Sequence, residues 1–464
     1  MSIILPDSIK HKLLDYQISH AINLIHILGK NGAVLDSSDT GVGKTYACAA
    51  VCAYMKYHPI VVCPRSVIST WKSVMKRFDV TPAFIVNHET LKFGKYYDAT
   101  GKRIRCPYIK IIDKDSNKQT YEWILDNKHK YVIVFDEAHR CQNFNSLNGQ
   151  LMYSAKQTQC PMMMLSATIA DQYEKFRILF YCLNFISPEE VARQKLSYER
   201  YQYIVSNWLA RDSNPLQRIH NMLYPDRASR IRIESLGDKF PDTQIIAQPY
   251  TLEPKRARDI ENAYREISKL LDDLKAKTAT DKANILVKIL RAHQRIEILK
   301  VPIFVELAHD FIESGYSVVI FVNYSDTLRL LAEMLQTVCL IHGQQTNEQR
   351  ERNIKSFQDN ESRIIISNIK AGGIGISLND VHGGHPRASL ISPSWSSVEL
   401  VQALGRVHRA GGKSKSIQRI IYVDNTIETH IADKLQAKLK AIGTINDGDL
   451  DLTGIHFERE RITA

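Results

Sequence analysis

The residues best suited to chemistry begin with a glycine-rich loop at positions 38–45, SDTGVGKT. Gly41 and Gly43 permit backbone conformations that a Cβ atom forbids, so successive N–H groups can turn toward a polyphosphate. Lys44 is expected to reach the β- and γ-phosphates, and the Thr45 hydroxyl to ligate Mg²⁺. Ser38 departs from the pattern GxxxxGK[ST], which has glycine there. The expected nucleotide-binding loop residues are Thr40, Gly41, Val42, Gly43, Lys44 and Thr45.

A second chemical signal is the pair Asp136 and Glu137, which follows an all-apolar stretch at 131–135. We expect Asp136 to hold Mg²⁺, directly or through water, and Glu137 to polarise the attacking water. The alternative is that two acidic residues after a strand merely begin a helix. The phosphate-binding loop upstream favours the catalytic interpretation.

The third signal is Arg406 and Arg409, three residues apart on an expected helix and therefore on one helix face. They are either surface charges on a basic helix or arginine fingers, whose planar guanidinium groups suit a γ-phosphate. The sequence leaves both interpretations open.

These residues need elements to position them, and the chain alternates between apolar strands and helix-length segments in two stretches. The loop at 38–45 lies between an expected strand (32–35) and an expected helix (46–57), whose amino terminus adds partial positive charge. Further strands are expected at 60–64, 83–86, 131–135 and 162–165, and again at 317–322, 338–343, 363–367 and 389–395. The pattern predicts an α/β protein with two doubly wound parallel sheets in tandem.

Between the two stretches the alternation stops. We expect domain 1 at 1–188, a helical insertion or linker at 189–285, domain 2 at 286–442 and a polar tail at 443–464. The insertion contains a long charged helix (252–275) and an arginine cluster that either contacts phosphates or is solvated. The segment 101–118 reads as a surface excursion. The arginine cluster comprises Arg211, Arg218, Arg227, Arg230 and Arg232.

The composition of the chain also indicates which class of partner it binds. The chain has 464 residues and a formal net charge of +11, which favours a polyanionic partner, most simply nucleic acid, over a generally basic surface. Its 8 cysteines form no CxxC pair, so neither a zinc site nor a disulfide framework is indicated. No signal peptide or membrane-length apolar run is visible, so we expect a soluble intracellular protein, in cytoplasm, nucleus or viral particle.

Taken in order, the motifs resemble the first motor domain of superfamily 2 helicases. They are Gln17, GVGKT (41–45), VCPRSVISTW (62–71), DEAH (136–139) and SAT (166–168). The third and fourth, at 63–71 and 136–140, look most like the Swi/Snf branch. In the second half, AGGIGI (371–376) and the segment 402–409 are similar to the fifth and sixth motifs of the same family.

The resemblance implies two RecA-like domains, ATP and Mg²⁺ as cofactors, and further site residues. Gln17, which can read an adenine edge, and Gly375, Arg406 and Arg409 would bind nucleotide. His139, Ser166, Thr168 and Gln402 would couple the nucleotide to the rest of the fold, the hydroxyls through hydrogen bonds to His139. The implied nucleic-acid contacts are Pro64, Arg65, Ser66, Asn87, Gly343, Asn368, Lys370, Ala371 and Gly372.

For function, the resemblance implies a nucleic-acid-dependent ATPase, here a double-stranded DNA translocase that remodels bound complexes, with a transcription or replication complex as partner. One alternative is a helicase that separates DNA or RNA strands, which Ser166-Ala167-Thr168 favours because the Swi/Snf branch usually has a Gly-Thr version. Another is a non-catalytic nucleic-acid-binding transcription scaffold, which would be expected to lose Lys44, Glu137 or an arginine finger. Gly405 replaces an Asp common in the branch, and the chain without reader domains resembles compact motors of large DNA viruses and phages.

Overall fold

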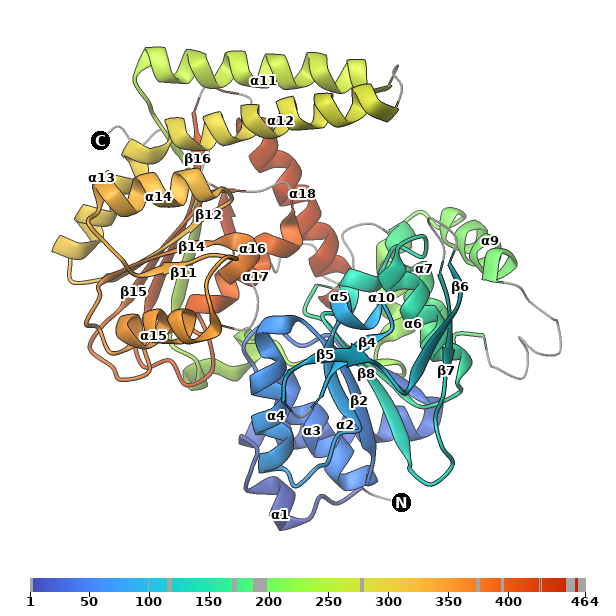
Figure 1. The fold of residues 1–464 in the computed structure, drawn as a ribbon. Coiled ribbons are helices and arrows are strands. Elements are labelled where there is room, and N and C mark those ends of the chain that lie inside the picture. Colours follow the sequence, from blue (N-terminus) through green and yellow to red (C-terminus); the bar gives the residue numbers. More distant parts are fainter. Residues whose placement is uncertain are drawn as a thin grey trace. The chain divides into compact units, whose positions relative to one another are not determined.

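A computed structural model of the protein describes residues 3–98, 100–114, 119–168, 173–186, 198–275, 279–372, 376–393, 396–424, 426, 428–447 and 455–457. The chain divides into two compact units (Figure 1). Unit 1 contains residues 1–237 and 439–452, and unit 2 contains residues 238–438 and 453–464.

Unit 1 is built on a parallel sheet with strand order β10-β1-β9-β8-β2-β3. All described side chains of β1, β8 and β9 are buried, as expected for parallel strands covered on both faces. The strands are β1 (Ala33–Asp36), β2 (His58–Cys63), β3 (Phe84–Asn87), β8 (Tyr131–Asp136), β9 (Met162–Leu165) and β10 (Ala228–Ser229).

Helices cover both faces of this sheet. Alternate strand residues divide between two apolar cores, with Val34, Val132 and Met163 in one and Leu35, Ile133 and Met164 in the other. The first core lies under α2 (Asp15–Asn31), α3 (Lys44–Met55) and α4 (Ile68–Arg77). The second lies under α6 (Leu147–Gln157), α7 (Arg177–Cys182), α9 (Tyr198–Ala210) and α10 (Pro215–Leu223).

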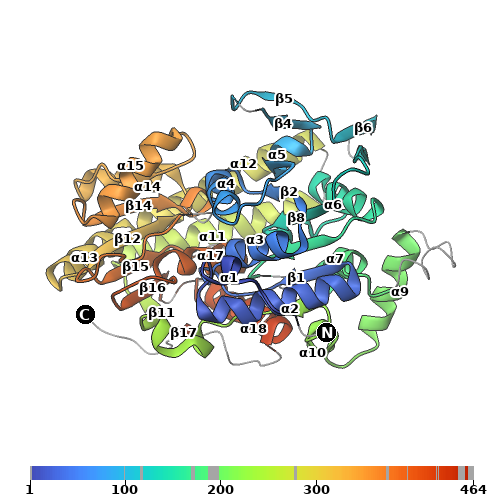
Figure 2. The same cartoon turned by 90° about the horizontal axis from the view of Figure 1, so that it is seen from below.

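The surface excursion between β3 and β8 consists of two antiparallel hairpins. The first pairs β4 (Lys95–Tyr97) with β5 (Arg103–Arg105), and the second pairs β6 (Ile109–Lys114) with β7 (Gln119–Trp123). Both views show β4 and β5 near α5 (His88–Leu91), and Figure 2 shows this hairpin at the margin of unit 1 (Figures 1 and 2).

Unit 2 is a second parallel sheet, with strand order β13-β14-β12-β15-β16-β11-β17. The predicted fold class, two RecA-like doubly wound domains in tandem, is confirmed. The strands are β11 (Thr243–Tyr250), β12 (Ser317–Val322), β13 (Leu340–Ile341), β14 (Ile364–Asn368), β15 (Arg387–Ile391), β16 (Ser416–Val423) and β17 (Ile455–Phe457).

Strand β11 was not expected from the sequence. It pairs with β16 over residues 243–250, inside the stretch 189–285 in which we expected no strand. The boundary between the two units along the chain, between Gly237 and Asp238, falls in the same stretch. Its sequence, TQIIAQPY, mixes polar and apolar residues and contains Pro249, which weakens the strand signal.

The helices of unit 2 begin with α11 (Pro254–Lys275) and α12 (Ala279–Leu299), which pack along one another as a long pair (Figure 1). The expected long helix thus exists, and its residues Ile260, Tyr264 and Ile267 are buried against the unit 2 core. The others are α13 (Val301–Glu313), α14 (Ser325–Met334), α15 (Asn347–Gln358), α16 (Ile369–Gly372), α17 (Ser397–Val407) and the first part of α18 (Glu428–Asp447), whose residues from 439 onward belong to unit 1.

The remaining helical segments are short. They are α1 (Asp7–Lys10) and the 3₁₀ turns η1 (Arg65–Val67), η2 (Ala138–Cys141), η3 (Tyr173–Phe176) and η4 (Glu234–Lys239). Over the described part of the chain, none of the helices combines the length and the apolar character that crossing a bilayer requires.

Candidate nucleotide-binding and hydrolysis site

The glycine-rich loop connects β1 to α3 and turns sharply at two glycines. Gly41 has φ +92° and Gly43 has φ +97°, conformations that residues with a side chain rarely adopt. A Cβ atom on Gly43 would lie 2.2 Å from Nε2 of Gln17. Glycine at 43 is therefore required both by the backbone turn and by the neighbouring helix α2.

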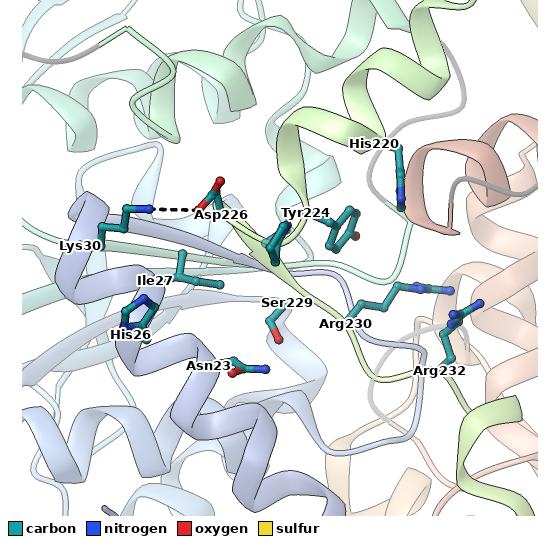
Figure 3. Close-up of a pocket in the computed structure, with 12 residues that line it drawn as sticks. Asn23, His26, Ile27, Lys30, His220, Tyr224, Asp226, Ser229, Arg230 and Arg232 are labelled. Carbon is teal, nitrogen blue, oxygen red and sulfur yellow. Dashed lines mark hydrogen bonds and ion pairs between the residues drawn. The ribbon is translucent and has the colours of Figure 1, made fainter. Parts of the chain in front are cut away.

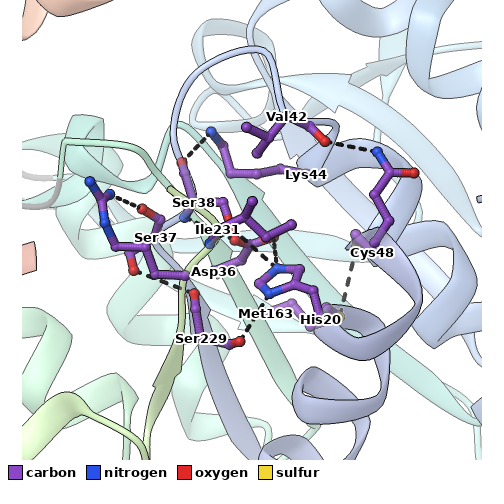
Figure 4. A network of polar contacts seen from close by, with 12 residues as sticks. His20, Asp36, Ser37, Ser38, Val42, Lys44, Cys48, Met163, Ser229 and Ile231 are labelled. Carbon is purple, nitrogen blue, oxygen red and sulfur yellow. Dashed lines mark hydrogen bonds and ion pairs between the residues drawn. The ribbon is translucent and has the colours of Figure 1, made fainter. Parts of the chain in front are cut away.

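Lys44, the first residue of α3, folds back over this loop. Its Nζ donates to the carbonyl oxygens of Ser38 (2.8 Å) and Asp39 (3.1 Å), as Figure 4 shows for Ser38. Burial lowers the pKa of the Lys44 ammonium, while the carboxylates of Asp36, Glu137 and Asp136 raise it. The ammonium group is thus held at the loop and lies within electrostatic range of the acidic pair at the end of β8.

Ser38, the residue that departs from the glycine pattern, is fixed by its side chain. Its Oγ accepts a hydrogen bond from the Ile231 N–H (2.9 Å) and contacts Nε2 of His20 (3.2 Å) (Figure 4). His20 Nε2 also lies 3.1 Å from Asp36 Oδ2, and its Nδ1 contacts Ser229 Oγ (2.9 Å). A serine at this position therefore ties the loop to α2 and to the chain around β10.

The segment after β10 holds the other side of the loop. Arg230 donates to the Ser37 carbonyl (2.6 Å) and pairs with Asp39 Oδ1 (2.8 Å). The Ile233 N–H donates to Asp39 Oδ2 (2.8 Å). Arg230 also lines a pocket of about 490 Å³ between α2 and residues 220–232, together with His26, Lys30 and Arg232 (Figure 3).

Asp136 ends β8 with its carboxylate buried. Oδ2 accepts from the indole N–H of Trp71 (2.8 Å), and Oδ1 accepts from the Glu137 N–H (3.0 Å). Burial raises the pKa of Asp136 to about 6, and the negative charge of Glu137 adds to the rise. A divalent cation would relieve that excess of negative charge, and carboxylate and hydroxyl oxygens are ligands that Mg²⁺ accepts. Asp136 and Thr45 therefore fit the predicted magnesium site.

Glu137 adopts a left-handed backbone conformation, with φ +53° and ψ +50°. For a residue other than glycine this costs about 1–3 kcal/mol, a strain that clusters at functional sites. Its Oε2 lies 3.4 Å from Nδ1 of His139. Burial lowers the pKa of His139, which favours the neutral imidazole.

The hydroxyl of Ser166, beyond β9, lies 3.0 Å from the same His139 nitrogen, so the expected hydrogen bond between them is present. Thr168 does not repeat it. Its Oγ1 is buried and makes no hydrogen bond to any described residue.

The remaining predicted residues of unit 1 lie at the same edge or close to it. Gln17 is 3% exposed, and its amide donates to the Val42 carbonyl (2.8 Å) and accepts from the Leu14 N–H (2.9 Å). Arg65 is exposed in η1, between buried Pro64 and partly buried Ser66. Asn87 ends β3 with its side chain buried, where it bonds to Glu89 and Tyr97. The adenine and nucleic-acid contacts of these residues stay predictions.

In unit 2 the two arginines lie beside the segment of the fifth motif. Arg406 is 3% exposed, and its NH1 donates to the Ile376 carbonyl (3.3 Å). Arg409 is partly buried and donates to the same carbonyl (2.6 Å) and to Ser377 Oγ (2.8 Å). The prediction that both share one helix face was wrong, because α17 ends at Val407 and His408 is extended, with its ring bonded to the Pro241 carbonyl.

The other predicted residues of unit 2 lie in several places. Gln402 is buried within α17, Gly343 and Lys370 are exposed, and Asn368 ends β14. Ala371 and Gly372 belong to the short helix α16, and Gly375 lies outside the described residues.

Sequence reasoning assigned no role to His20, Trp71 or Ser229. His20 follows Gln17 by three residues on α2, so the helical period gave a signal that it faces the loop. Trp71 lies inside a quoted motif, but its bond to Asp136 joins residues 65 positions apart. Ser229 belongs to a two-residue strand and carries no pattern at all.

Comparison with known proteins gives two family matches along the chain. Residues 299–411 match the helicase conserved C-terminal domain, and residues 10–171 match the family described as type III restriction enzyme, res subunit. A protein of Acanthamoeba polyphaga mimivirus, provisionally named ATP-dependent RNA helicase L364, is 43% identical over 95% of this chain and 84% of its own length.

More distant relatives are longer proteins. The human SWI/SNF-related matrix-associated actin-dependent regulator of chromatin subfamily A member 1 is 25% identical over 92% of this chain, which spans only 43% of that relative. Among solved structures, the Sulfolobus solfataricus SWI2/SNF2 ATPase core in complex with dsDNA matches over 97% of both chains at 17% identity. Its TM-score of 0.38 is too low to support an argument.

Proposed function

The chain belongs to the superfamily 2 helicases, nucleic-acid-dependent ATPases, and within that family we propose that it is a motor of the Swi/Snf-like branch that moves along double-stranded DNA. The observation that carries the proposal is the grouping of Lys44, Asp136 and Glu137 in one electrostatic environment in unit 1. A scaffold without catalysis would not need to bury these charges together, because burial of each is costly.

Each residue of the site then has a chemical task. Lys44 exchanges its bonds to the loop carbonyls for the β- and γ-phosphates of ATP, and the loop N–H groups hold the phosphate oxygens. Thr45 and Asp136 would hold Mg²⁺, which would supply neutralisation of the phosphate charge. Glu137 accepts the proton of the attacking water. Its neighbour His139 couples the nucleotide site to the rest of the fold through the contact with the Ser166 hydroxyl. Arg406 and Arg409 act on the γ-phosphate from unit 2.

The choice of double-stranded DNA translocation rests on the Swi/Snf-like motifs and on the chromatin regulator among the relatives. Strand separation is the second candidate. It is favoured by Ser166-Ala167-Thr168 and by the name of the mimivirus relative, an RNA helicase. Both candidates need contacts mainly to the phosphate backbone, which carry no sequence information.

The experiment that separates them measures ATP hydrolysis with duplex DNA, single-stranded DNA or RNA as the stimulating strand. We expect duplex DNA to stimulate most, and the protein to displace a third strand from a DNA triplex without separating the duplex. Preferential stimulation by RNA, with release of a labelled strand from an RNA duplex, would replace translocation by unwinding. No stimulation by any of the three would overturn the motor itself.

Glu137→Gln is expected to bind ATP normally and to hydrolyse it about 10²–10⁴-fold more slowly, because the amide is a poor proton acceptor. The measurement pairs nucleotide affinity with the turnover number. Glu122→Gln, which changes an exposed carboxylate on β7, is the matched control and should leave both unchanged. Near-normal turnover in Glu137→Gln would assign the base to another residue.

A further inference from the structure

Hairpin β4–β5, residues 95–105, is a feature that the proposed site does not use. It follows β3 and α5, so it leaves the sheet from the carboxyl end of an edge strand (Figure 2). In open α/β sheets this is the edge at which ligands bind. We refer to residues 95–105 as the basic hairpin.

The basic hairpin is anchored to the unit 1 core. The Tyr97 hydroxyl donates to Asn87 Oδ1 (3.0 Å), at the end of β3. The ring of Tyr96 packs edge-to-face on Phe84, with 6.0 Å between centroids. The Cys106 N–H donates to the Gly94 carbonyl (2.9 Å). These contacts fix both ends of the hairpin, so its outer side chains have a defined position relative to the sheet.

The outer face carries positive charge. Lys95, Arg103 and Arg105 are exposed, and none of them forms an ion pair with an acidic side chain among the described residues. Arg105 lies directly opposite Lys95 in the antiparallel register, and Arg103, two residues away, lies opposite Tyr97. The three basic residues therefore share one face with Tyr97, whose hydroxyl bonds to Asn87. Like charges directly opposite each other destabilise a hairpin. An anion bound across this face would remove that cost.

We propose that the basic hairpin is an additional nucleic-acid contact, which binds phosphates of the strand that the motor tracks through Lys95, Arg103 and Arg105. Side chains two residues apart on a strand are separated by about 6.8 Å. The long side chains of lysine and arginine can reach out from these positions to phosphates of one nucleic-acid strand, each of which carries a negative charge. Arginine forks bind phosphate oxygens two at a time. The inference rests on the proposed function, since it needs a nucleic-acid substrate.

The test uses the full chain with Arg103→Gln and Arg105→Gln together, and measures duplex DNA and RNA binding as a function of salt. Each phosphate contact that is lost should make the slope of log affinity against log salt shallower by about 1, so we expect a change of about 2. More nucleic acid should be needed for half-maximal ATPase stimulation. ATP hydrolysis without nucleic acid should stay at the wild-type rate, because the hairpin is outside the nucleotide site.

Lys128→Gln with Lys130→Gln is the matched control. It removes the same charge from unit 1, just before the amino end of β8 and therefore at the opposite edge of the sheet. Arg103→Lys with Arg105→Lys keeps the charge and should keep the slope, so a folding defect is separable from a lost contact.

The outcomes for the two proposals differ. A wild-type protein that no nucleic acid binds or stimulates would overturn the proposed function. If nucleic acid stimulates the wild-type ATPase but the Arg103→Gln, Arg105→Gln variant has the same salt slope as the Lys128→Gln, Lys130→Gln control, only the hairpin contact would be overturned. Binding of polyglutamate, a model for an acidic protein, is measured for the same variants. If the glutamine variant lost polyglutamate binding but kept the wild-type salt slope for nucleic acid, the hairpin contact would also be overturned, in favour of an acidic protein partner.

Discussion

Lys44→Ala is expected to abolish ATP turnover. The Lys44 ammonium is already positioned at the phosphate loop by the carbonyls of Ser38 and Asp39, and the alanine side chain cannot reach a phosphate. Loss of a preorganised charge at the transferring phosphoryl group removes the main electrostatic stabilisation of the reaction. Steady-state hydrolysis with saturating nucleic acid measures the effect.

The control for this variant is Lys128→Ala, which removes an exposed lysine from the same unit and should hydrolyse ATP at the wild-type rate. If Lys44→Ala retained turnover within tenfold of the wild type, the loop at 38–45 would not be the phosphate site. The assignment of Asp136 and Glu137 would then lose its basis as well.

Arg409→Ala is expected to lower turnover by about 10³-fold, the lower end of the range for arginine fingers. ADP lacks the γ-phosphate, so its affinity should stay near the wild-type value. Arg409 belongs to unit 2, whereas the phosphate loop belongs to unit 1, so this variant tests whether both units are needed for hydrolysis. The measurement compares nucleic-acid-stimulated ATPase with ADP affinity.

Two further variants make the result specific. Arg409→Lys should rescue poorly, because an ammonium cannot reproduce the planar fork. Arg329→Ala, on the exposed side of α14, should behave as the wild type. Wild-type rates in both Arg409→Ala and Arg406→Ala would show that these arginines only support the segment at Ile376 and Ser377.

The parts of the fold that the sequence predicted are those with a strong local pattern. Strands β8 and β9 are continuous apolar runs, and both lie where the pattern indicated, with Asp136 and Ser166 at or just beyond their carboxyl ends. The glycines at 41 and 43 indicated backbone conformations that a Cβ atom forbids, and both have positive φ. Local chemistry was sufficient in these cases, because each signal lies within a few residues.

The parts that the sequence did not predict depend on distant partners or on weak local signals. The Ser38 hydroxyl accepts a hydrogen bond from the Ile231 N–H, and the two residues are separated by 193 positions in the chain. Strand β10 has only two residues, too few for a periodicity of two to be visible. Helix α17 ends at Val407 although no glycine or proline stands there, and the next residue, His408, is extended and bonds to the distant Pro241 carbonyl.

The attachment of the phosphate loop to β10 has a mechanical consequence. Residues 230–233 hold Ser37, Ser38 and Asp39, and the chain leaves unit 1 for unit 2 shortly afterwards, at Gly237. A short series of hydrogen bonds therefore joins this connection to the loop whose carbonyls hold Lys44. By thermodynamic reciprocity, any change in nucleotide affinity that the arrangement of this connection produces must be matched by an equal effect of nucleotide binding on that arrangement.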